Sequence, residues 1–364
     1  MRGLNARISQ GALRPIRGID RRGTESAPDH ANVAPMRECT RIRGSLRYSC
    51  QLADMNANPF SLRCGQACIH LLSDGTSYWD GGGTFGLVPR IRWMKLLPPD
   101  ELNRVPQELR CVLIEADSKR ILVDCGVGNK PNDLIATQYD VRRSNGTLID
   151  DLARLGLRPA DIDIVILTHL HGDHSGWTTV LSADTTQAVG EASRDRVPIP
   201  TFTNARYYVQ RREYEDATHP NERTRNTYFA ENFVPLMQHG VLTLLDGEAQ
   251  ITPSVRVVPT PGHTAGHQSV IIEPHSGGAA SPPVFLIGDM APFMIHFERL
   301  PWVTAYDVLP MVTIETKRRW QQWAFERRAV LVSCHDTRQP VGRLVRNDKG
   351  LFSVVPLEAG GAPE

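Results

Sequence analysis

A dense group of metal-binding side chains follows a short apolar run near the middle of this chain. The run Ile162–Leu167 has the β-branched and aliphatic composition of a buried strand, and the segment 168–174 after it reads THLHGDH. Imidazole nitrogens and carboxylate oxygens are ligands that zinc and similar divalent ions prefer. Residues two apart in an extended segment point the same way, so His169 and His171 can bind one ion from one side.

The same segment offers donors for a second ion. Gly172 lets the chain turn sharply, and beyond it Asp173 and His174 can reach another position. The alternative is a polar surface loop that happens to hold histidines. The rest of the chain argues against that alternative, because other strand ends supply further ligands.

Three later runs of short, aliphatic or β-branched composition end in residues of the same chemistry. This pattern is typical of buried strands that deliver polar side chains to one rim of a sheet, where catalytic ligands tend to lie. Singly, an Asp or His after a strand is more often a turn or cap residue, so the argument depends on their order. The runs and their donors are Val255–Val258 with His263 and His267, Val284–Ile287 with Asp289, and Val330–Ser333 with Cys334, His335 and Asp336.

This order of motifs resembles the metallo-β-lactamase-fold hydrolase superfamily: HxHxDH, then PGHTxGH, then an Asp at a strand end, then a late His. Segment 121–126, ILVDCG, is similar to that superfamily's upstream LVDTG element, with Cys125 where Thr is common. The resemblance spans roughly Arg110 to Asp336. It implies an α/β fold, a four-layer αβ/βα sandwich with metals between its halves and a mainly helical insertion.

The resemblance also implies a dinuclear site. Two divalent ions, Zn²⁺ foremost with Mn, Co or Fe able to fit, would share a water and make hydroxide available near neutral pH. Asp289 and Asp173 are the implied catalytic residues, and Asp173 could also pass a proton to the leaving group. The implied ligands are His169, His171 and His263 for the first ion, Asp173, His174 and His335 for the second, and Asp289 as the bridge.

Three neighbouring residues are expected to support these ligands or to stay outside the site. Asp124 matches a residue beneath the histidine loop that orients ligands, the alternative being a plain turn aspartate. No ligand position is left for His267, which favours a structural role. Cys334 adjoins His335, but neighbours along a strand point to opposite faces, so we do not expect it to bind metal.

Within the superfamily, the ligand set favours ester hydrolysis. The β-lactam hydrolases carry Cys or His in place of Asp289, and oxygen-reducing diiron relatives have Glu in place of His171. The full set is shared by thioesterases of the glyoxalase II type, acyl-homoserine lactonases and phosphotriesterases, and RNA-processing nucleases share much of it. We therefore expect a small ester or lactone as the substrate. The alternatives are a thioester or phosphotriester substrate and a non-catalytic metal-binding protein.

Two segments resemble the lactonase and phosphotriesterase branch: residues 80–89, DGGGTFGLVP, and residues 204–231, expected to form a helix or two over the site. The well-known acyl-homoserine lactonases place a Tyr three residues after the bridging Asp, where this chain has Pro292. Nearby aromatic side chains either line an apolar pocket or pack in the core. They are Phe293, Phe297, Trp302 and Tyr306.

Composition argues against other partners. The 364 residues carry a formal net charge of +1, which offers no basic footprint for nucleic acid, and no apolar run approaches a membrane-spanning length. The seven cysteines are odd in number, and Cys64 and Cys68 lack the second pair of a structural zinc site. We expect free thiols in the cytoplasm. A homodimer is expected because relatives are often dimers.

Residues 1–54 are Arg-rich, with little apolar periodicity, and are expected to be disordered. They lack the apolar core of a secretory signal, their scattered Asp and Glu weaken a transit-peptide interpretation, and a start of translation at Met55 is a further hypothesis. The hydrolase domain is expected over 55–357, with 358–364 as a loose tail. Within it we predict a hairpin of strands 111–116 and 121–124 and helices at 147–155 and 314–328.

Overall fold

The computed structural model describes residues 59–130, 132, 135, 139–182, 196–274 and 281–357. The predicted N-terminal extension, the hypothetical start at Met55 and the predicted tail at 358–364 lie outside these residues. Among the helices in the described ranges, none is long and apolar enough to span a bilayer.

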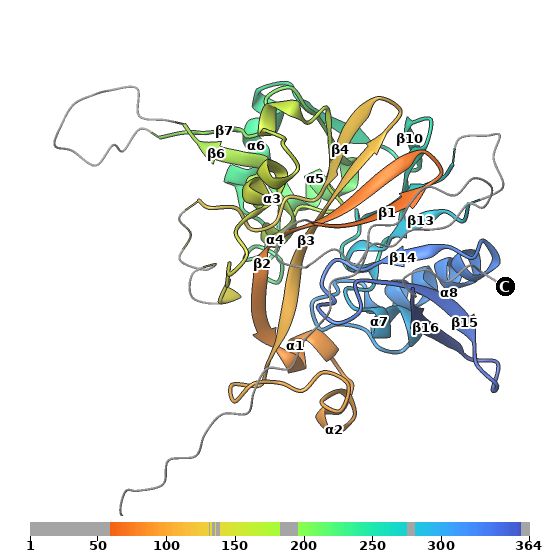
Figure 1. Ribbon diagram of the computed structural model, residues 1–364. Coiled ribbons are helices and arrows are strands. Elements are labelled where there is room, and N and C mark those ends of the chain that lie inside the picture. Colours follow the sequence, from red (N-terminus) through yellow and green to blue (C-terminus); the bar gives the residue numbers. More distant parts are fainter. Residues whose placement is uncertain are drawn as a thin grey trace, which may run out of the picture. The chain divides into compact units, whose positions relative to one another are not determined.

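Two seven-stranded sheets form the centre of the fold (Figure 1). The first has the order β1-β2-β3-β4-β5-β8-β9, and the second runs from β10 to β16 in sequence order. The strands of the first sheet are Phe60–Cys64, Ala67–Asp80, Arg104–Ala116, Lys119–Val123, Ile164–Ile166, Arg206–Gln210 and Leu242–Leu245. Those of the second are Ala249–Thr252, Val255–Pro259, Gln268–Ile272, Val284–Leu286, Val330–Val332, Val341–Arg346 and Phe352–Pro356.

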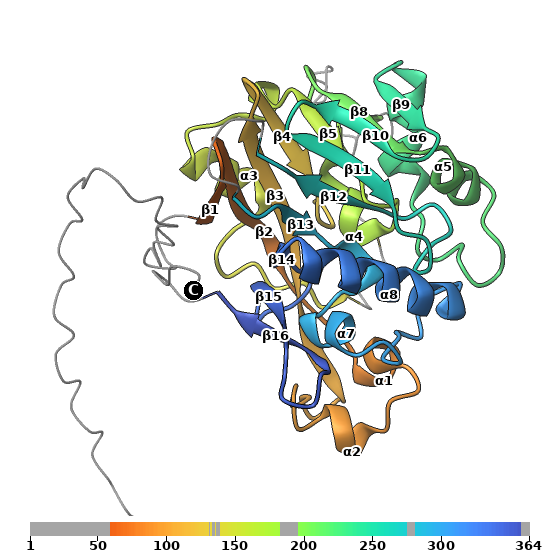
Figure 2. The same ribbon diagram turned by 90° about the vertical axis from the view of Figure 1, so that its right-hand side faces the viewer.

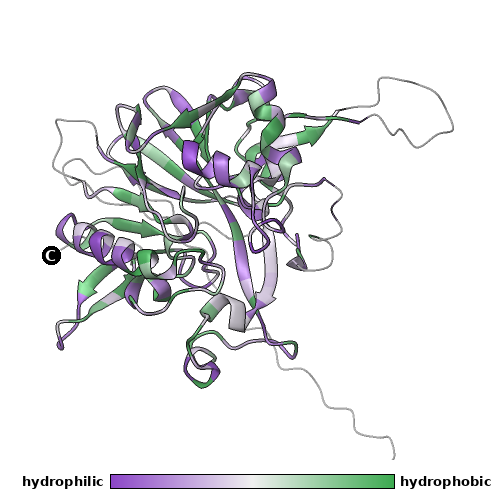
Figure 3. Ribbon diagram, turned by 180° about the vertical axis from the view of Figure 1, so that it is seen from behind, coloured by the Kyte–Doolittle hydropathy of each residue, from purple (hydrophilic) through white to green (hydrophobic). Residues whose placement is uncertain are grey.

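Helices cover the outer face of each sheet. The helices α3 (Leu148–Arg154), α5 (Arg211–Thr218) and α6 (Ala230–Gln238) pack on the first sheet, and α7 (Met294–Glu298) and α8 (Pro310–Glu326) pack on the second (Figure 2). One apolar core lies between the sheets and one lies beneath each helical layer. Figure 3 shows the hydrophobic colouring concentrated along the strands. The predicted four-layer sandwich is confirmed.

The shorter elements lie at the rims of this sandwich. A separate pair, β6 (Thr179–Leu181) and β7 (Pro198–Pro200), forms a two-stranded sheet. Strands β2 and β3 continue as a long hairpin that leads to α1 (Gly81–Phe85) and α2 (Arg90–Trp93) (Figure 1). Phe85 and Trp93 stack there, with ring centroids 4.9 Å apart, in a small apolar cluster that also contains Phe293 and Trp302.

Both predicted helices are present, but only one has the predicted bounds. Thr147 caps α3, and its hydroxyl and Asp150 form a reciprocal capping box. Helix α8 begins at Pro310, earlier than the predicted start, and ends at Glu326. Proline is favoured in a first helical turn, whereas the exposed Met311 and Val312 break the apolar periodicity from which the start was predicted.

The segment 204–231 contains the predicted helical part, with α5 and the start of α6, but it opens with a strand. Residues Arg206–Gln210 form β8, which pairs in parallel with β5 and β9. Their side chains alternate: Tyr207 and Val209 pack into the core beneath the helices, and Tyr208 packs against the core between the sheets. That period of two is the signature of a strand, and the helical part begins only at Arg211.

A buried carboxylate, Asp74, ties β2 to the loops beneath the predicted histidine site. One oxygen accepts hydrogen bonds from the backbone N–H groups of Val127 and Gly128 and from the Arg143 guanidinium, each at 3.0 Å. The other accepts from Leu148 N at 3.2 Å and from the Trp177 indole at 2.7 Å. Asp74 therefore connects a strand, two loops and the start of α3 through one side chain.

Candidate metal centre

The histidine segment turns sharply where it leaves β5. Helix α4 (Gly172–Ser175) starts immediately after His171, so the extended and helical parts of the segment point their donors in different directions. Gly172 is required there, because a Cβ at that position would lie 2.0 Å from the ring of Phe229. Gly176 is required as well, because a Cβ at that position would lie 1.8 Å from the backbone of Val127.

The first group of donors consists of His169, His171 and His263. The Nδ1 atom of His171 lies 3.1 Å from His169 Nε2 and 3.1 Å from His263 Nε2. All three side chains are buried. Burial lowers the pKa of His169 and His171, so these imidazoles are neutral and their ring nitrogens can offer lone pairs to one point.

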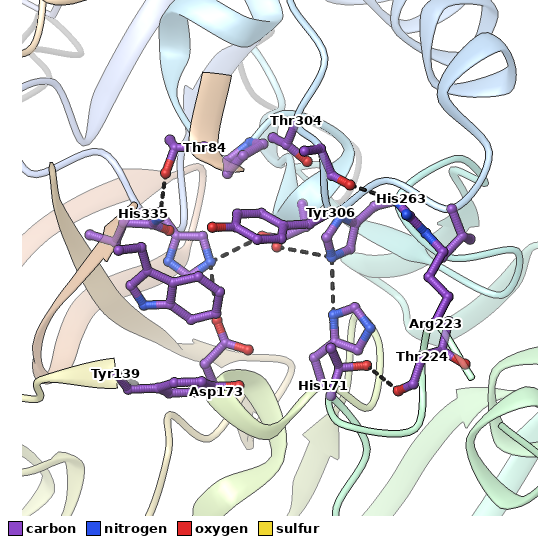
Figure 4. Close-up of a pocket in the computed structure, with 17 residues that line it drawn as sticks. Thr84, Tyr139, His171, Asp173, Arg223, Thr224, His263, Thr304, Tyr306 and His335 are labelled. Carbon is purple, nitrogen blue, oxygen red and sulfur yellow. Dashed lines mark hydrogen bonds and ion pairs between the residues drawn. The ribbon is translucent and has the colours of Figure 1, made fainter. Parts of the chain in front are cut away.

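The second group consists of Asp173, His174 and His335. The Nε2 atoms of the two histidines are 3.2 Å apart, and each lies 3.7 Å from the same carboxylate oxygen of Asp173. Figure 4 shows His171 and His263 on one side of the pocket and Asp173 and His335 on the other.

Asp289 lies between the two groups and turns one oxygen toward each. Its Oδ2 is 3.3 Å from His263 Nε2 and 4.0 Å from His169 Nε2. Its Oδ1 is 3.5 Å from His174 Nε2 and 3.2 Å from His335 Nε2. Buried carboxylates normally resist ionisation, but the surrounding imidazoles hold the pKa of Asp289 well below its usual range.

The donor set fits two divalent ions. The first group presents three imidazole nitrogens and the second two imidazole nitrogens and a carboxylate, all suitable for zinc, and the donor atoms of each group lie within 4.8 Å of one another. Hydrogen bonds made by Nδ1 orient four of the five rings so that Nε2 faces the centre; these rings are His169, His174, His263 and His335. His171 instead faces the centre through Nδ1, and its Nε2 has no hydrogen-bond partner among the described residues.

Asp124 orients two of these histidines, as the resemblance implies. It accepts a hydrogen bond from His174 Nδ1–H at 2.8 Å and another from the Thr168 hydroxyl at 2.8 Å. The Thr168 oxygen in turn accepts from His169 Nδ1–H at 3.0 Å. The backbone of Asp124 has a φ of 58°, a conformation that Asp tolerates better than most residues. It is therefore more than a turn residue.

His267 has the structural role predicted for it. Its Nε2 accepts a hydrogen bond from the backbone N–H of Asp289 at 2.9 Å, and its Nδ1–H donates to the Thr260 hydroxyl at 2.7 Å. Burial lowers the pKa of His267 to about 3, which keeps the ring neutral and Nε2 free to accept. The residue thus fixes the backbone that carries the central carboxylate.

Sequence motifs gave no sign of two buried carboxylates that support the site. Asp307 accepts from His263 Nδ1–H at 3.0 Å and from the hydroxyls of Thr304 and Thr313, each at 2.7 Å. Glu213 joins the two histidine loops, because it accepts from Leu170 N and from the hydroxyls of Tyr228 and Thr264. Asp307 lies in a segment without a motif, and the segment of Glu213 is notable only for its resemblance to the lactonase branch, so the fold is what brings both carboxylates to the site.

Changing Asp307 to Asn should weaken metal binding without unfolding the chain. The amide keeps the shape and an acceptor oxygen, but it loses the charge that makes His263 a stronger donor to a metal. We expect a loss of roughly 10- to 100-fold in metal affinity, the usual cost of losing such a partner. Competition with a chromogenic chelator measures it, with Asp246→Asn at an exposed site as the control. Equal affinities in the two variants would contradict the assigned role.

The expectation for Cys334 is wrong in one respect. Its thiol does not point away from the site but donates a hydrogen bond to Asp289 Oδ1 at 3.0 Å. The reason is that β14 ends at Val332, so the alternation of a strand no longer applies at Cys334. Burial raises the pKa of this thiol well above its usual range, which keeps it a neutral donor beside the carboxylate.

A cavity of about 180 Å³ opens over Asp173, Asp289 and the neighbouring histidines. Of the four aromatic residues in question, Tyr306 lines it, whereas Phe293, Phe297 and Trp302 are buried in apolar clusters. Figure 4 shows the Tyr306 ring projecting between His263 and His335. The remaining lining includes Trp79, Tyr139, Pro292, Val308, Thr84, Gln107 and Arg223.

Residues 110–279 match the family model of the metallo-beta-lactamase superfamily. This part of the chain is a metallo-β-lactamase superfamily domain. The family model and the fold confirm the resemblance in the sequence. The matched range contains five of the seven predicted ligands, and Asp289 and His335 follow it in the chain.

Known proteins are similar to this chain over most of their own length. An N-acyl homoserine lactonase from Bacillus sp is 27% identical over 261 residues, covering 68% of this chain and 87% of the relative. A probable metal-dependent hydrolase from Staphylococcus aureus has a structure with a TM-score of 0.69 and 27% identity, covering 81% of this chain and 99% of that one. AidC, a dizinc quorum-quenching lactonase solved with a product, shares the fold with a TM-score of 0.63 and 18% identity, covering 84% and 99%.

Proposed function

We propose that the protein is a dinuclear metal-dependent hydrolase that opens a small lactone or cleaves a related ester. The observation that carries this proposal is the position of Asp289, whose two oxygens face two separate groups of donors. A carboxylate placed in this way suits a bridge between two ions. Zinc is the metal we favour for these nitrogen and oxygen donors.

In this proposal seven residues hold the ions, and the chemistry follows from their position on the cavity floor. Two divalent ions bound by these residues would supply an activated water near neutral pH and would polarise the substrate's carbonyl group. The ligands are His169, His171 and His263 for one ion, Asp173, His174 and His335 for the other, and Asp289 between them.

The protein's own side chains select and orient the substrate. The small cavity favours a compact substrate, and Trp79 and Tyr139 provide apolar contact for its carbon chain. Asp173 faces the cavity, where it can return a proton to the leaving oxygen. Tyr306 places a phenol over the same floor, at another position in the sequence than the tyrosine that lactonases carry where this chain has Pro292.

The relatives support the substrate class in this proposal, and the unpaired thiols support the cellular compartment. The curated relative from Bacillus sp is named an N-acyl homoserine lactonase, which favours an acyl-homoserine lactone over other esters. The described cysteines Cys64, Cys68, Cys111, Cys125 and Cys334 are unpaired, which favours action in a reducing cytoplasm.

Acid release from an acyl-homoserine lactone, followed by pH-stat, tests the proposal directly. Zinc-loaded protein should open the ring, and the same protein after chelation and dialysis should not. Restoring zinc should restore the rate. If zinc-loaded protein with its metal content verified leaves the lactone intact, the lactone assignment is wrong. Thioesters and phosphotriesters are then the substrates to assay.

A further inference from the structure

A second group of metal-binding side chains lies on the outer face of the first sheet. Cys68 and His70 are two residues apart on β2, and Glu115 pairs with Cys68 across the sheet on β3. Their neighbours Ala67, Ile69 and Ile114 face the core between the sheets, so these three side chains point the other way. A sulfur, a nitrogen and an oxygen of the group lie within 4.8 Å of one another.

The ring of His70 is held between two polar neighbours. Its Nδ1 lies 2.7 Å from the Ser61 hydroxyl, which also lies 3.2 Å from the carbonyl oxygen of Pro59. Its Nε2 faces a carboxylate oxygen of Glu115 at 3.3 Å. This contact requires a cation between the two atoms, either a proton on Nε2 or a metal ion.

The surrounding charges allow either a proton or a metal ion to be that cation. Arg120 lies 3.5 Å from the other oxygen of Glu115, which leaves the oxygen beside His70 available. Arg63 pairs with Cys68 across the strands and opposes, but does not overcome, the effect of burial, which raises the pKa of the thiol. The thiol is thus protonated until a metal displaces its proton.

We propose that Cys68, His70 and Glu115 form a mononuclear zinc site, separate from the dinuclear centre. Thiolate, imidazole and carboxylate are all accepted zinc ligands, and a water completes four-coordination at this half-buried face. Ser61 holds the imidazole by its other nitrogen, as partners of metal-bound histidines commonly do. Since the ligands come from two paired strands and their support from a third, the ion braces the β1 edge of the sheet.

Cobalt substitution of the full-length protein tests this site without any assay of activity. A thiolate ligand gives cobalt a charge-transfer band in the near ultraviolet, and imidazole and carboxylate ligands do not. We expect the band in the wild type, its loss in Cys68→Ser, and its persistence in Cys334→Ser. Zinc content after dialysis against a weak chelator should fall by one ion per chain in Cys68→Ser and in His70→Gln.

Two results would overturn the site, and neither depends on whether the dinuclear centre hydrolyses a lactone. Identical spectra and zinc contents in the wild type, Cys68→Ser and His70→Gln would leave only an ion pair between a protonated His70 and Glu115. A band lost in Cys334→Ser but kept in Cys68→Ser would place the thiolate beside Asp289 instead. Far-ultraviolet circular dichroism shows that each variant is folded, and Glu115→Gln provides a third variant that keeps the side-chain shape.

Discussion

Replacing Asp289 with alanine should abolish hydrolysis and lower the metal content of the purified protein. The side chain turns one oxygen to each group of donors, so its removal takes a ligand from both ions at once. The loss of metal affinity should exceed the roughly 10- to 100-fold loss that follows when a hydrogen-bond partner of a metal ligand is removed. Turnover of the lactone and metal content by mass spectrometry are the two measurements.

Control variants separate the effect of losing the bridging carboxylate from the effect of losing a negative charge. Asp246→Ala removes an exposed carboxylate and should retain full turnover. Asp289→Asn keeps the volume and the hydrogen bond from Cys334 but loses the charge, and it should be nearly as inactive as the alanine variant. Wild-type turnover in Asp289→Ala with both ions bound would exclude the bridging carboxylate.

Replacing Asp74 with alanine should have the largest effect on stability. The change leaves Arg143 without its buried partner and four further donors, from Val127, Gly128, Leu148 and Trp177, without an acceptor. Breaking a buried ion pair by removing one partner costs about 3–5 kcal/mol. We expect a loss of this size in the free energy of unfolding.

Urea unfolding of the metal-free protein measures this loss without interference from bound ions. Asp348→Ala, at an exposed turn, is the matched control and should unfold at the wild-type midpoint. Arg143→Met should cost less than Asp74→Ala, because the four uncharged donors keep their acceptor. If Asp74→Ala unfolds at the same urea concentration as Asp348→Ala, the Asp74 carboxylate does not hold these loops in place.

The layers and the metal-binding motifs could be predicted because they depend on local patterns. Alternating or continuous apolar runs mark the strands, and donors that follow strand ends collect at one rim. The same logic failed at Cys334, where the strand had already ended, and at the start of α8, where exposed apolar residues hide the helical period. Such patterns identify a strand or a helix more reliably than they locate its first and last residues.

The supporting residues could not be predicted because they act through contacts that only the folded chain creates. Asp307 and Glu213 are single carboxylates that belong to no ligand motif, and Asp74 precedes the histidine loop by about a hundred residues. Tyr306 lines the cavity and Phe293 packs in an apolar cluster, a difference that their positions in the sequence do not reveal. The separation of two residues along the sequence does not predict whether their side chains meet in the folded protein.

The division of the ligands between the sheets has a consequence for the lifetime of the protein. Residues 169–174 follow the first sheet's β5, whereas His263, Asp289 and His335 come from loops of the second sheet, and each donor group draws on both. In the proposed dinuclear centre, each bound ion would therefore cross-link the two halves of the sandwich. An ion present at 100 times its dissociation constant adds about 2.7 kcal/mol of stability. In a cell short of metal the protein would be less stable, and proteases would cleave it more readily where its two halves meet.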